Sequence, residues 1–239
     1  MNYKIEKYIT NRNEWLLSEV KKKYLKLDFI FTKEFHARVS DQGEKATIYL
    51  PEDSFSEECI SHELLHLYLE TKENIVYCLL IGLIRENDYL KMIFSKDLIE
   101  NMINCIHHIK MLPIFIQMGY DKANFLANSS LNKCEINYTK RIKKRFKIIG
   151  IYNKIAIDNY IGKYFAMKAD ISEIDYSIQL NILFETDNVL YNILQNFWTK
   201  WLKFDIYNSN TIEYWSDDFV GEFLDSLEKW IKDKKLNKY

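Results

Sequence analysis

Two histidines and a glutamate stand at a spacing that suits metal chemistry, in the stretch SHELLHLYLE at residues 61–70. On an α-helix, side chains four residues apart differ by about 40° in direction and lie about 6 Å apart along the axis. The imidazoles of His62 and His66 can therefore converge on one zinc ion, at about 2.0–2.1 Å from it. Glu63 is rotated away by one residue, so it can reach a water molecule on the metal and act as a general base.

The elements expected around this stretch favour a built site over a chance occurrence. Ser54 or Ser56 can cap a helix, and Glu57 and Glu58 suit the positive end of its dipole. The helix should run to about residue 72, directly after a predicted strand. This is the structural context that a metal-binding helix of this type needs.

The arrangement of His62, Glu63 and His66 resembles that of the zincin metallopeptidases. The resemblance implies that the two histidines are zinc ligands and that Glu63 is the catalytic base. It also implies that the preceding hairpin takes the place of a substrate-binding edge strand. The motif spans residues 62–66, so it identifies a broad clan and not a substrate.

A catalytic zinc usually has three protein ligands, so a third must come from elsewhere in the chain. The extended HExxHxxGxxH pattern is absent, because Leu69 and Lys72 occupy the positions of its glycine and last histidine. A glutamate from a later helix is one option, and Glu86 or Glu100 could serve. Histidine is the other option, and the chain has five: His36, His62, His66, His107 and His108.

A second resemblance favours one of these histidines. Residues 60–121 are similar to uncharacterised small bacterial HExxH proteins, in which a helix with NxxxH, a proline and a Gly-Tyr pair follow the motif. Here these features are Asn104, His108, Pro113 and Gly119-Tyr120. The resemblance implies that His108 is the third ligand.

Four further residues are candidates for supporting roles around the metal. His107 is the alternative ligand or a partner of the ligands, and Glu100 is a further alternative. Asn104, one turn before His108, could orient a ligand or the substrate. Glu70 lies four residues after His66; we interpret it as a surface residue in the last turn of the helix, with a hydrogen bond to a ligand histidine as the alternative. No residue is assigned to oxyanion stabilisation, although Tyr120 is the tyrosine nearest to the motif in sequence.

The remaining patterns predict an α+β fold that is mainly α. Residues 29–40 and 45–50 are separated by a turn at Gly43, and apolar side chains alternate along the second segment. This pattern predicts a β-hairpin or small sheet packed on the HExxH helix. A helical bundle-like C-terminal part should follow, so the expected domains are a metal-binding core at 1–125 and a helical extension at 126–239. Expected helices span 11–25, 54–72, 74–86, 95–112, 134–148, 150–168, 172–184, 187–205 and 214–235, with Gly119 as a helix stop.

Composition limits the partners. The chain carries 33 basic and 34 acidic residues in 239, for a net charge of −1, which gives no global reason to expect nucleic acid or membranes. The basic run KRIKKRFK at 140–147 is interpreted as a solvated helix face. The longest apolar run, at 75–84, is about half of the roughly 20 residues that span a bilayer. We therefore expect no membrane partner.

Cysteine usage and the N-terminal sequence predict a cytoplasmic protein. Its four cysteines form no CxxC pair and are expected to be reduced. The N-terminus is polar and lacks the apolar stretch of a signal peptide. Four tryptophans in helical patterns, Trp198, Trp201, Trp215 and Trp230, are expected in the core.

The leading hypothesis is a zinc-dependent hydrolase, a metallopeptidase that acts on a peptide or protein. Its alternative is a zincin-like binding or regulatory module with a structural or vestigial metal. A third possibility is a helical protein without metal, in which His62 and His66 only pack. The presence of Glu63 argues for catalysis, because a structural site needs no base.

Overall fold

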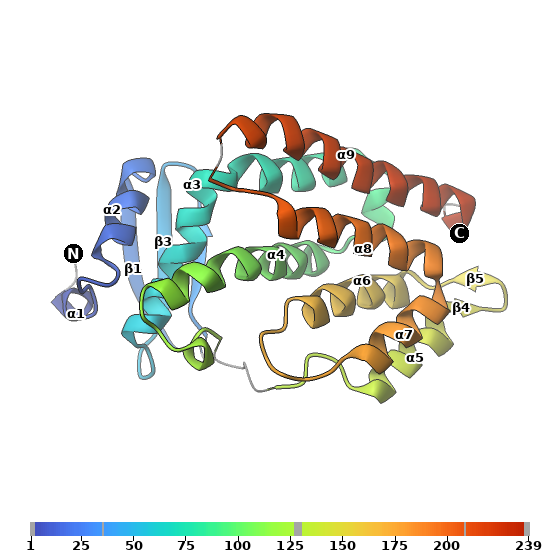
Figure 1. Ribbon diagram of the computed structural model, residues 1–239, viewed down its shortest axis with the longest axis horizontal. Coiled ribbons are helices and arrows are strands. Elements are labelled where there is room, and N and C mark those ends of the chain that lie inside the picture. Colours follow the sequence, from blue (N-terminus) through green and yellow to red (C-terminus); the bar gives the residue numbers. More distant parts are fainter. Residues whose placement is uncertain (1–2, 35, 127–130, 208, 237–239) are drawn as a thin grey trace. The chain divides into compact units, whose positions relative to one another are not determined.

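In the computed structural model the chain forms two units, the first from Met1–Asn74 and His107–Ser130 and the second from Ile75–Ile106 and Leu131–Tyr239 (Figure 1). The structure describes residues 3–34, 36–126, 131–207 and 209–236. The predicted domains, 1–125 and 126–239, differ from these units chiefly in residues 75–106. As a functional division they stay a prediction.

The first unit contains a small sheet and the helices that precede and follow it. The strand order is β1-β3-β2, with β1 parallel to β3 and β2 antiparallel to it. Its elements are α1 (Tyr3–Glu6), α2 (Glu14–Lys23), β1 (Lys26–Thr32), β2 (Arg38–Asp41), β3 (Lys45–Pro51), the first part of α3 (Glu57–Glu86), the last part of α4 (Lys96–Gln117) and the 3-10 turn η2 (Lys122–Asn124).

The predicted hairpin is confirmed as the β2–β3 pair. Gly43 has a φ of 82° in the turn, and the Asp41 carboxylate accepts a hydrogen bond of 2.7 Å from its backbone N–H. Ala46, Ile48 and Leu50 are fully buried on β3. The prediction of one strand over 29–40 was wrong, because β1 ends at residue 32 and pairs in parallel with β3. An alternating pattern reports burial and does not report the direction of pairing.

The histidine motif lies on a longer helix than expected. α3 runs unbroken for 30 residues, where two helices meeting near residue 73 were predicted. The residues around position 73, where the break was predicted, include no glycine or proline. Nothing therefore interrupts the helical hydrogen bonds there. The cap at Ser56 is confirmed, since its Oγ accepts a hydrogen bond of 3.2 Å from the Cys59 N–H.

The second histidine helix also extends beyond its predicted end. α4 continues past Pro113, although proline removes one helical hydrogen bond. The helix ends where Gly119 adopts a φ of 86°, and the N–H of Tyr120 bonds back to the carbonyl of Phe115. The predicted stop at Gly119 is confirmed.

The second unit is helical apart from one short hairpin, and its helices match the predicted ones to within a few residues at most ends. The prediction of tryptophans in the core is confirmed for Trp198, Trp201 and Trp230, while the Trp215 side chain lies outside the described part. The elements are η1 (Leu90–Met92), α5 (Ile136–Phe146), β4 (Lys147–Ile148), β5 (Ile151–Tyr152), α6 (Lys154–Lys168), α7 (Ser177–Thr186), α8 (Asn188–Lys203) and α9 (Ser209–Asp233), with the remaining parts of α3 and α4.

The β4–β5 hairpin occupies the place where two predicted helices were to meet. Its turn residues Ile149 and Gly150 both have positive φ, 49° and 83°. Two positive φ values are typical of the type I′ turn, which suits the twist of a tight hairpin. Each strand has only two residues, too few for an alternating pattern to reveal it.

The predicted class, α+β and mainly α, is confirmed. The basic side chains at 140–147 are exposed, as expected for a solvated helix face. Within the described ranges, no helix combines the length and apolarity needed to cross a membrane.

Candidate metal centre

Three histidines from two helices converge in the first unit. His62 and His66 lie on α3 and His108 lies on α4, and one ring nitrogen from each falls within 4.8 Å of the others. The ring centroids are 4.9 Å apart for His62 and His66, 5.1 Å for His62 and His108, and 5.3 Å for His66 and His108. The arrangement is a near-equilateral triangle of imidazoles.

The triangle fits a zinc ion by its donor type and its spacing. The Nε2 atoms of His62 and His66 are 3.2 Å apart. In a tetrahedron with zinc–nitrogen bonds of about 2.0–2.1 Å, two ligand atoms are separated by about 3.3 Å. Neutral imidazole is also a preferred zinc ligand. The three side chains could therefore hold such an ion with only small adjustments.

Burial keeps these imidazoles in the form that binds metal. It lowers the pKa of His62 to about 4. The pKa of His66 lies well below its ordinary value, first because of burial and then because neighbouring imidazoles disfavour another positive charge. Both rings are therefore neutral at neutral pH, and their lone pairs are available to a metal.

Glu63 is a buried carboxyl next to His62. Its exposed fraction is 6%, and its carboxyl forms no hydrogen bond or ion pair with the residues that the structure describes. Burial raises its pKa to about 8. A metal cation nearby would favour the carboxylate and lower this pKa, which is the requirement for a general base.

His107 and Glu70 lie next to the triangle but outside it. The His107 ring is 5.8 Å from that of His66, and its Nε2 is 4.0 Å from Oε1 of Glu70. Burial lowers the pKa of His107 to about 4 and raises that of Glu70 to about 7. Of the two adjacent histidines, the structure thus brings His108 to His62 and His66 and sets His107 beside them.

The other candidates from the sequence are placed at the surface. Glu86, Glu100 and Asn104 are exposed. Glu100 forms an ion pair with Lys96 at 3.5 Å. Among the described residues, none of these three joins the group that could hold a metal.

One aromatic wall of the site was not expected from the sequence. The ring of Phe125 lies 4.8 Å from that of His62 and 5.4 Å from that of His108. Phe115 packs on it at 5.2 Å. Phe125 follows η2 in an irregular segment, where neither periodicity nor a motif marks it. Its ring adds to the burial of the His62 imidazole, and burial is the main cause of the low pKa of His62.

A buried polar network holds the helix start next to the motif. The Tyr120 hydroxyl donates to Glu57 at 2.7 Å and accepts from Ser61 at 3.0 Å. Asn13 donates to Ser61 at 3.0 Å, and Thr10 donates to Glu57 at 2.6 Å. Tyr120, the tyrosine nearest to the motif in sequence, therefore has hydrogen-bond partners that anchor α3 one residue before His62.

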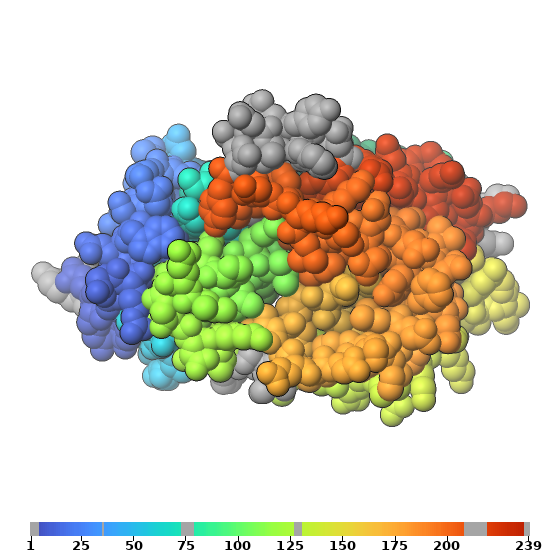
Figure 2. All heavy atoms as spheres, in the orientation of Figure 1, coloured from blue at the N-terminus to red at the C-terminus, as the bar shows by residue number. Residues whose placement is uncertain are grey.

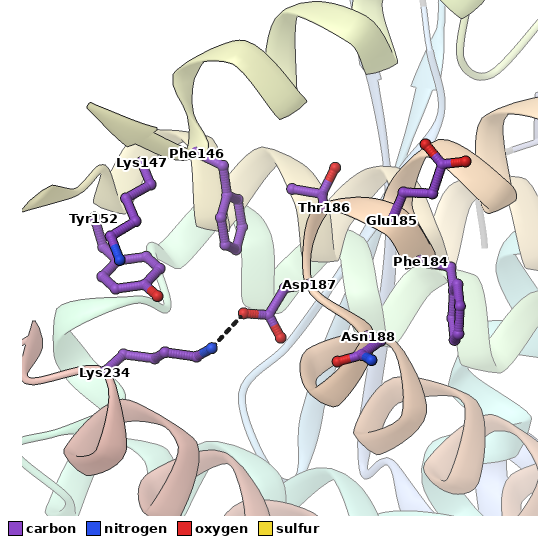
Figure 3. A pocket seen from close by; sticks show the side chains of 9 residues that line it. All are labelled: Phe146, Lys147, Tyr152, Phe184, Glu185, Thr186, Asp187, Asn188 and Lys234. Atoms are coloured by element: carbon purple, nitrogen blue, oxygen red, sulfur yellow. Dashed lines mark ion pairs between the residues drawn. The ribbon is translucent and has the colours of Figure 1, made fainter. Parts of the chain in front are cut away.

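The second unit has a cavity of about 350 Å³ with a different character (Figure 3). Asp187 lies at its base, and the Lys234 amine reaches its carboxylate at 2.9 Å. The same carboxylate accepts hydrogen bonds from the Leu190 N–H and the Trp230 indole, at 2.9 and 3.2 Å. An acid with this many partners has a structural role. The lining residues are Phe146, Lys147, Tyr152, Phe184, Glu185, Thr186, Asp187, Asn188 and Lys234.

Comparison of the chain with protein-family models, with curated proteins and with solved structures gave no match.

Proposed function

We propose that this chain is a zinc-dependent hydrolase of the zincin type that cleaves peptide bonds. The observation that carries the proposal is the convergence of His62, His66 and His108, with one nitrogen from each within 4.8 Å of the others. A buried carboxyl, Glu63, follows the first of them on the same helix. Three histidine ligands with one acid nearby are typical of a catalytic zinc site.

The residues of the site would divide the work as follows. His62, His66 and His108 would hold the ion, which supplies a Lewis acid that acidifies water and polarises a carbonyl. Glu63 would accept the proton of the attacking water and return it to the leaving amine. Phe125 would limit the access of bulk water to the imidazoles, which strengthens electrostatic interactions inside the site.

His107 and Glu70 support the same assignment. A histidine ligand is commonly oriented by a nearby carboxylate or carbonyl, directly or through water. Glu70 and His107 are the buried polar groups beside His66 that could take this role, and Lys23 fixes the Glu70 backbone through a hydrogen bond of 3.1 Å to its carbonyl.

An extended peptide is the proposed substrate. β1 and β2 are the edges of the sheet in the first unit, and each leaves one row of backbone groups available for an added strand. We also propose a cytoplasmic location. It is supported by Cys59, Cys105 and Cys134, which are free thiols.

Metal content tests the ligand assignment. The protein would be purified without added metal, and zinc would be measured by inductively coupled plasma mass spectrometry. We expect about one zinc per chain in the wild type and a loss of at least about tenfold in occupancy for His62→Ala and His108→Ala. His36 is an exposed histidine, and His36→Ala is the matched control that should retain the metal.

Peptide cleavage tests the catalytic assignment. With a mixed peptide library as substrate, Glu63→Gln should retain zinc and lose about 10²- to 10⁴-fold in turnover. If Glu63→Gln retained zinc with unchanged turnover, Glu63 would not be the general base. Zinc bound by four protein ligands, with no cleavage by any variant, would favour the alternative of a binding module with a structural metal.

A further inference from the structure

The second unit carries a dense basic surface around the β4–β5 hairpin. Residues 140–155 include seven lysines and arginines and no aspartate or glutamate, in a chain whose net charge is −1. The segment comprises most of α5, the hairpin and the start of α6. We call it the hairpin surface; its cations are Lys140, Arg141, Lys143, Lys144, Arg145, Lys147 and Lys154.

Most of this charge is not neutralised by the protein. Lys143 forms an ion pair of 2.7 Å with Glu185. The other six cations form no ion pair within the part of the chain that the structure describes. All seven are exposed. The surface therefore offers free positive charge to an anionic partner.

Four exposed isoleucines lie among these cations. Ile149, at the hairpin turn, is 97% exposed, and Ile155 is 74% exposed. Ile148 and Ile151, on the two strands, are exposed by 48% and 46%. Figure 1 shows the hairpin extending past the end of α5, and Figure 2 shows its atoms at the rim of the second unit. A protruding tip of this kind cannot bury its aliphatic side chains within its own unit.

Ile149 at the hairpin turn has a backbone conformation that is unfavourable for its residue type. Ile149 has a φ of 49°, in the left-handed region that β-branched residues avoid. Asparagine or glycine would fit the same turn without strain. A strained, fully exposed isoleucine therefore points to a role outside the fold.

We propose that the hairpin surface binds an anionic lipid bilayer, with the isoleucines entering the boundary between headgroups and acyl chains and the cations contacting the headgroups. Aliphatic side chains ringed by lysine and arginine are suited to this interface. The anionic leaflet of a cell membrane faces the cytoplasm, in agreement with the proposed location. The expectation of no membrane partner rested on the near-zero net charge of the whole chain and on the absence of a spanning segment. An interfacial contact requires neither, because a local cluster of cations is enough.

Two other partners fit the surface less well. Nucleic acid would satisfy the cations, but single strands are bound by stacking on exposed aromatic rings. The large exposed apolar side chains here are isoleucines, and the one aromatic ring of the hairpin, Tyr152, is only partly exposed. A second copy of the chain would bring seven cations against seven, which is repulsive.

Vesicle co-sedimentation tests the proposal on the full chain. Vesicles of phosphatidylcholine alone would be compared with vesicles of equal parts phosphatidylcholine and phosphatidylserine. We expect binding to the anionic vesicles to be at least about tenfold tighter and to weaken as salt is raised. Equal binding to both vesicles, or none to either, would overturn the proposal.

Substitutions separate the hairpin from the rest of the surface. Ile149→Asn should weaken vesicle binding by about tenfold, because it removes the apolar tip. The same change relieves the turn, so the melting temperature should not fall and a folding defect cannot explain the loss. Ile178 is 56% exposed near the start of α7, where the Gln179 side chain reaches the Cys134 carbonyl at the opposite end of α5. Ile178→Asn is the matched control and should bind like the wild type.

Charge reversal completes the test. Lys144→Glu should weaken binding to the anionic vesicles by at least about tenfold. Lys203 is an exposed cation on α8, and Lys203→Glu should leave vesicle binding unchanged. If Lys144→Glu instead abolished binding to a single-stranded oligonucleotide while vesicles were never bound, nucleic acid would replace the membrane as the partner. The membrane proposal would also be overturned if the wild type formed a dimer that Ile149→Asn disrupted, and neither protein bound vesicles.

Discussion

Two buried acids, one in each unit, are treated in opposite ways by the fold. Glu63 and Asp187 are almost equally buried, with exposed fractions of 6% and 7%. Asp187 caps α8 through the Leu190 N–H, accepts from the Trp230 indole and is paired with Lys234. Glu63 has none of these partners among the described residues, and burial raises its pKa to about 8.

The difference separates an acid that builds structure from one that is available for chemistry. A buried polar group without partners costs about 1–3 kcal/mol of stability, so a fold retains it only where something else requires it. Next to Glu63, three imidazoles converge on a point that suits a cation. Next to Asp187, by contrast, three donors already satisfy the carboxylate: the Leu190 N–H, the Trp230 indole and the Lys234 amine. The following predictions test this contrast, in order of decreasing effect.

Removing the structural acid should have the largest effect on stability. Asp187→Ala deletes a helix cap and leaves the Lys234 amine and the Trp230 N–H without their acceptor. We expect the free energy of unfolding to fall by about 2–4 kcal/mol, measured by urea denaturation. Metal content should be unchanged, because the acid lies in the other unit. Loss of zinc without loss of stability would reverse the roles assigned to the two acids.

The pH dependence of stability should identify Glu63 in the metal-free protein. Between its ordinary pKa of 4.5 and its folded pKa of about 8, the unfolded chain has released this proton and the folded chain keeps it. The unfolded state then binds fewer protons, so raising the pH through this window destabilises the wild type. Relative to Glu63→Gln, the wild type should lose stability progressively across the window, by at least about 1 kcal/mol, which corresponds to roughly one pKa unit, and nothing further above it.

This comparison requires chelator-treated protein and denaturation curves at several pH values. The histidines that also titrate are shared by both proteins, so their contribution cancels in the difference. A constant difference from pH 4.5 to 8 would show that Glu63 has an ordinary pKa.

Replacing Glu63 by an apolar side chain of similar length should stabilise the metal-free protein. Glu63→Met removes a carboxyl that has no described hydrogen-bond partner and keeps the side-chain volume. Below the folded pKa of Glu63 we expect a gain of about 1 kcal/mol in the free energy of unfolding. Replacing Asp187 by methionine should instead lower the free energy of unfolding. If both substitutions lowered it, Glu63 would have a structural role like that of Asp187.

The smallest effect is expected at an exposed acid next to Asp187. Glu185 pairs with Lys143, and both side chains are about half exposed, at 50% and 45%. Solvent screens such a pair, so Glu185→Gln should change the free energy of unfolding by about 0–1 kcal/mol. It is the control for Asp187→Ala, since it alters charge two residues away without touching the buried network.

Local rules explain which parts of this molecule could be predicted. The cap at Ser56, the turn at Gly43 and the stop at Gly119 depend on residues within a few positions of each other, and all three are found where the sequence places them. The continuous α3, the parallel β1 and the β4–β5 hairpin depend on packing or on very short elements, and each differs from the prediction.

The sequence by itself determined that His62 and His66 share one face of a helix with Glu63 beside them, because helical geometry converts a spacing of four into proximity. A resemblance favoured His108 over His107, but only the tertiary structure shows that the His108 ring lies beside those of His62 and His66. Neighbouring residues on a helix point about 100° apart, so the rotation of α4 about its axis selects which one meets α3. Three further features were decided by the tertiary structure: the position of the Phe125 ring against His62, the donors around Asp187, and the lack of partners at Glu63. Each depends on segments distant in the chain.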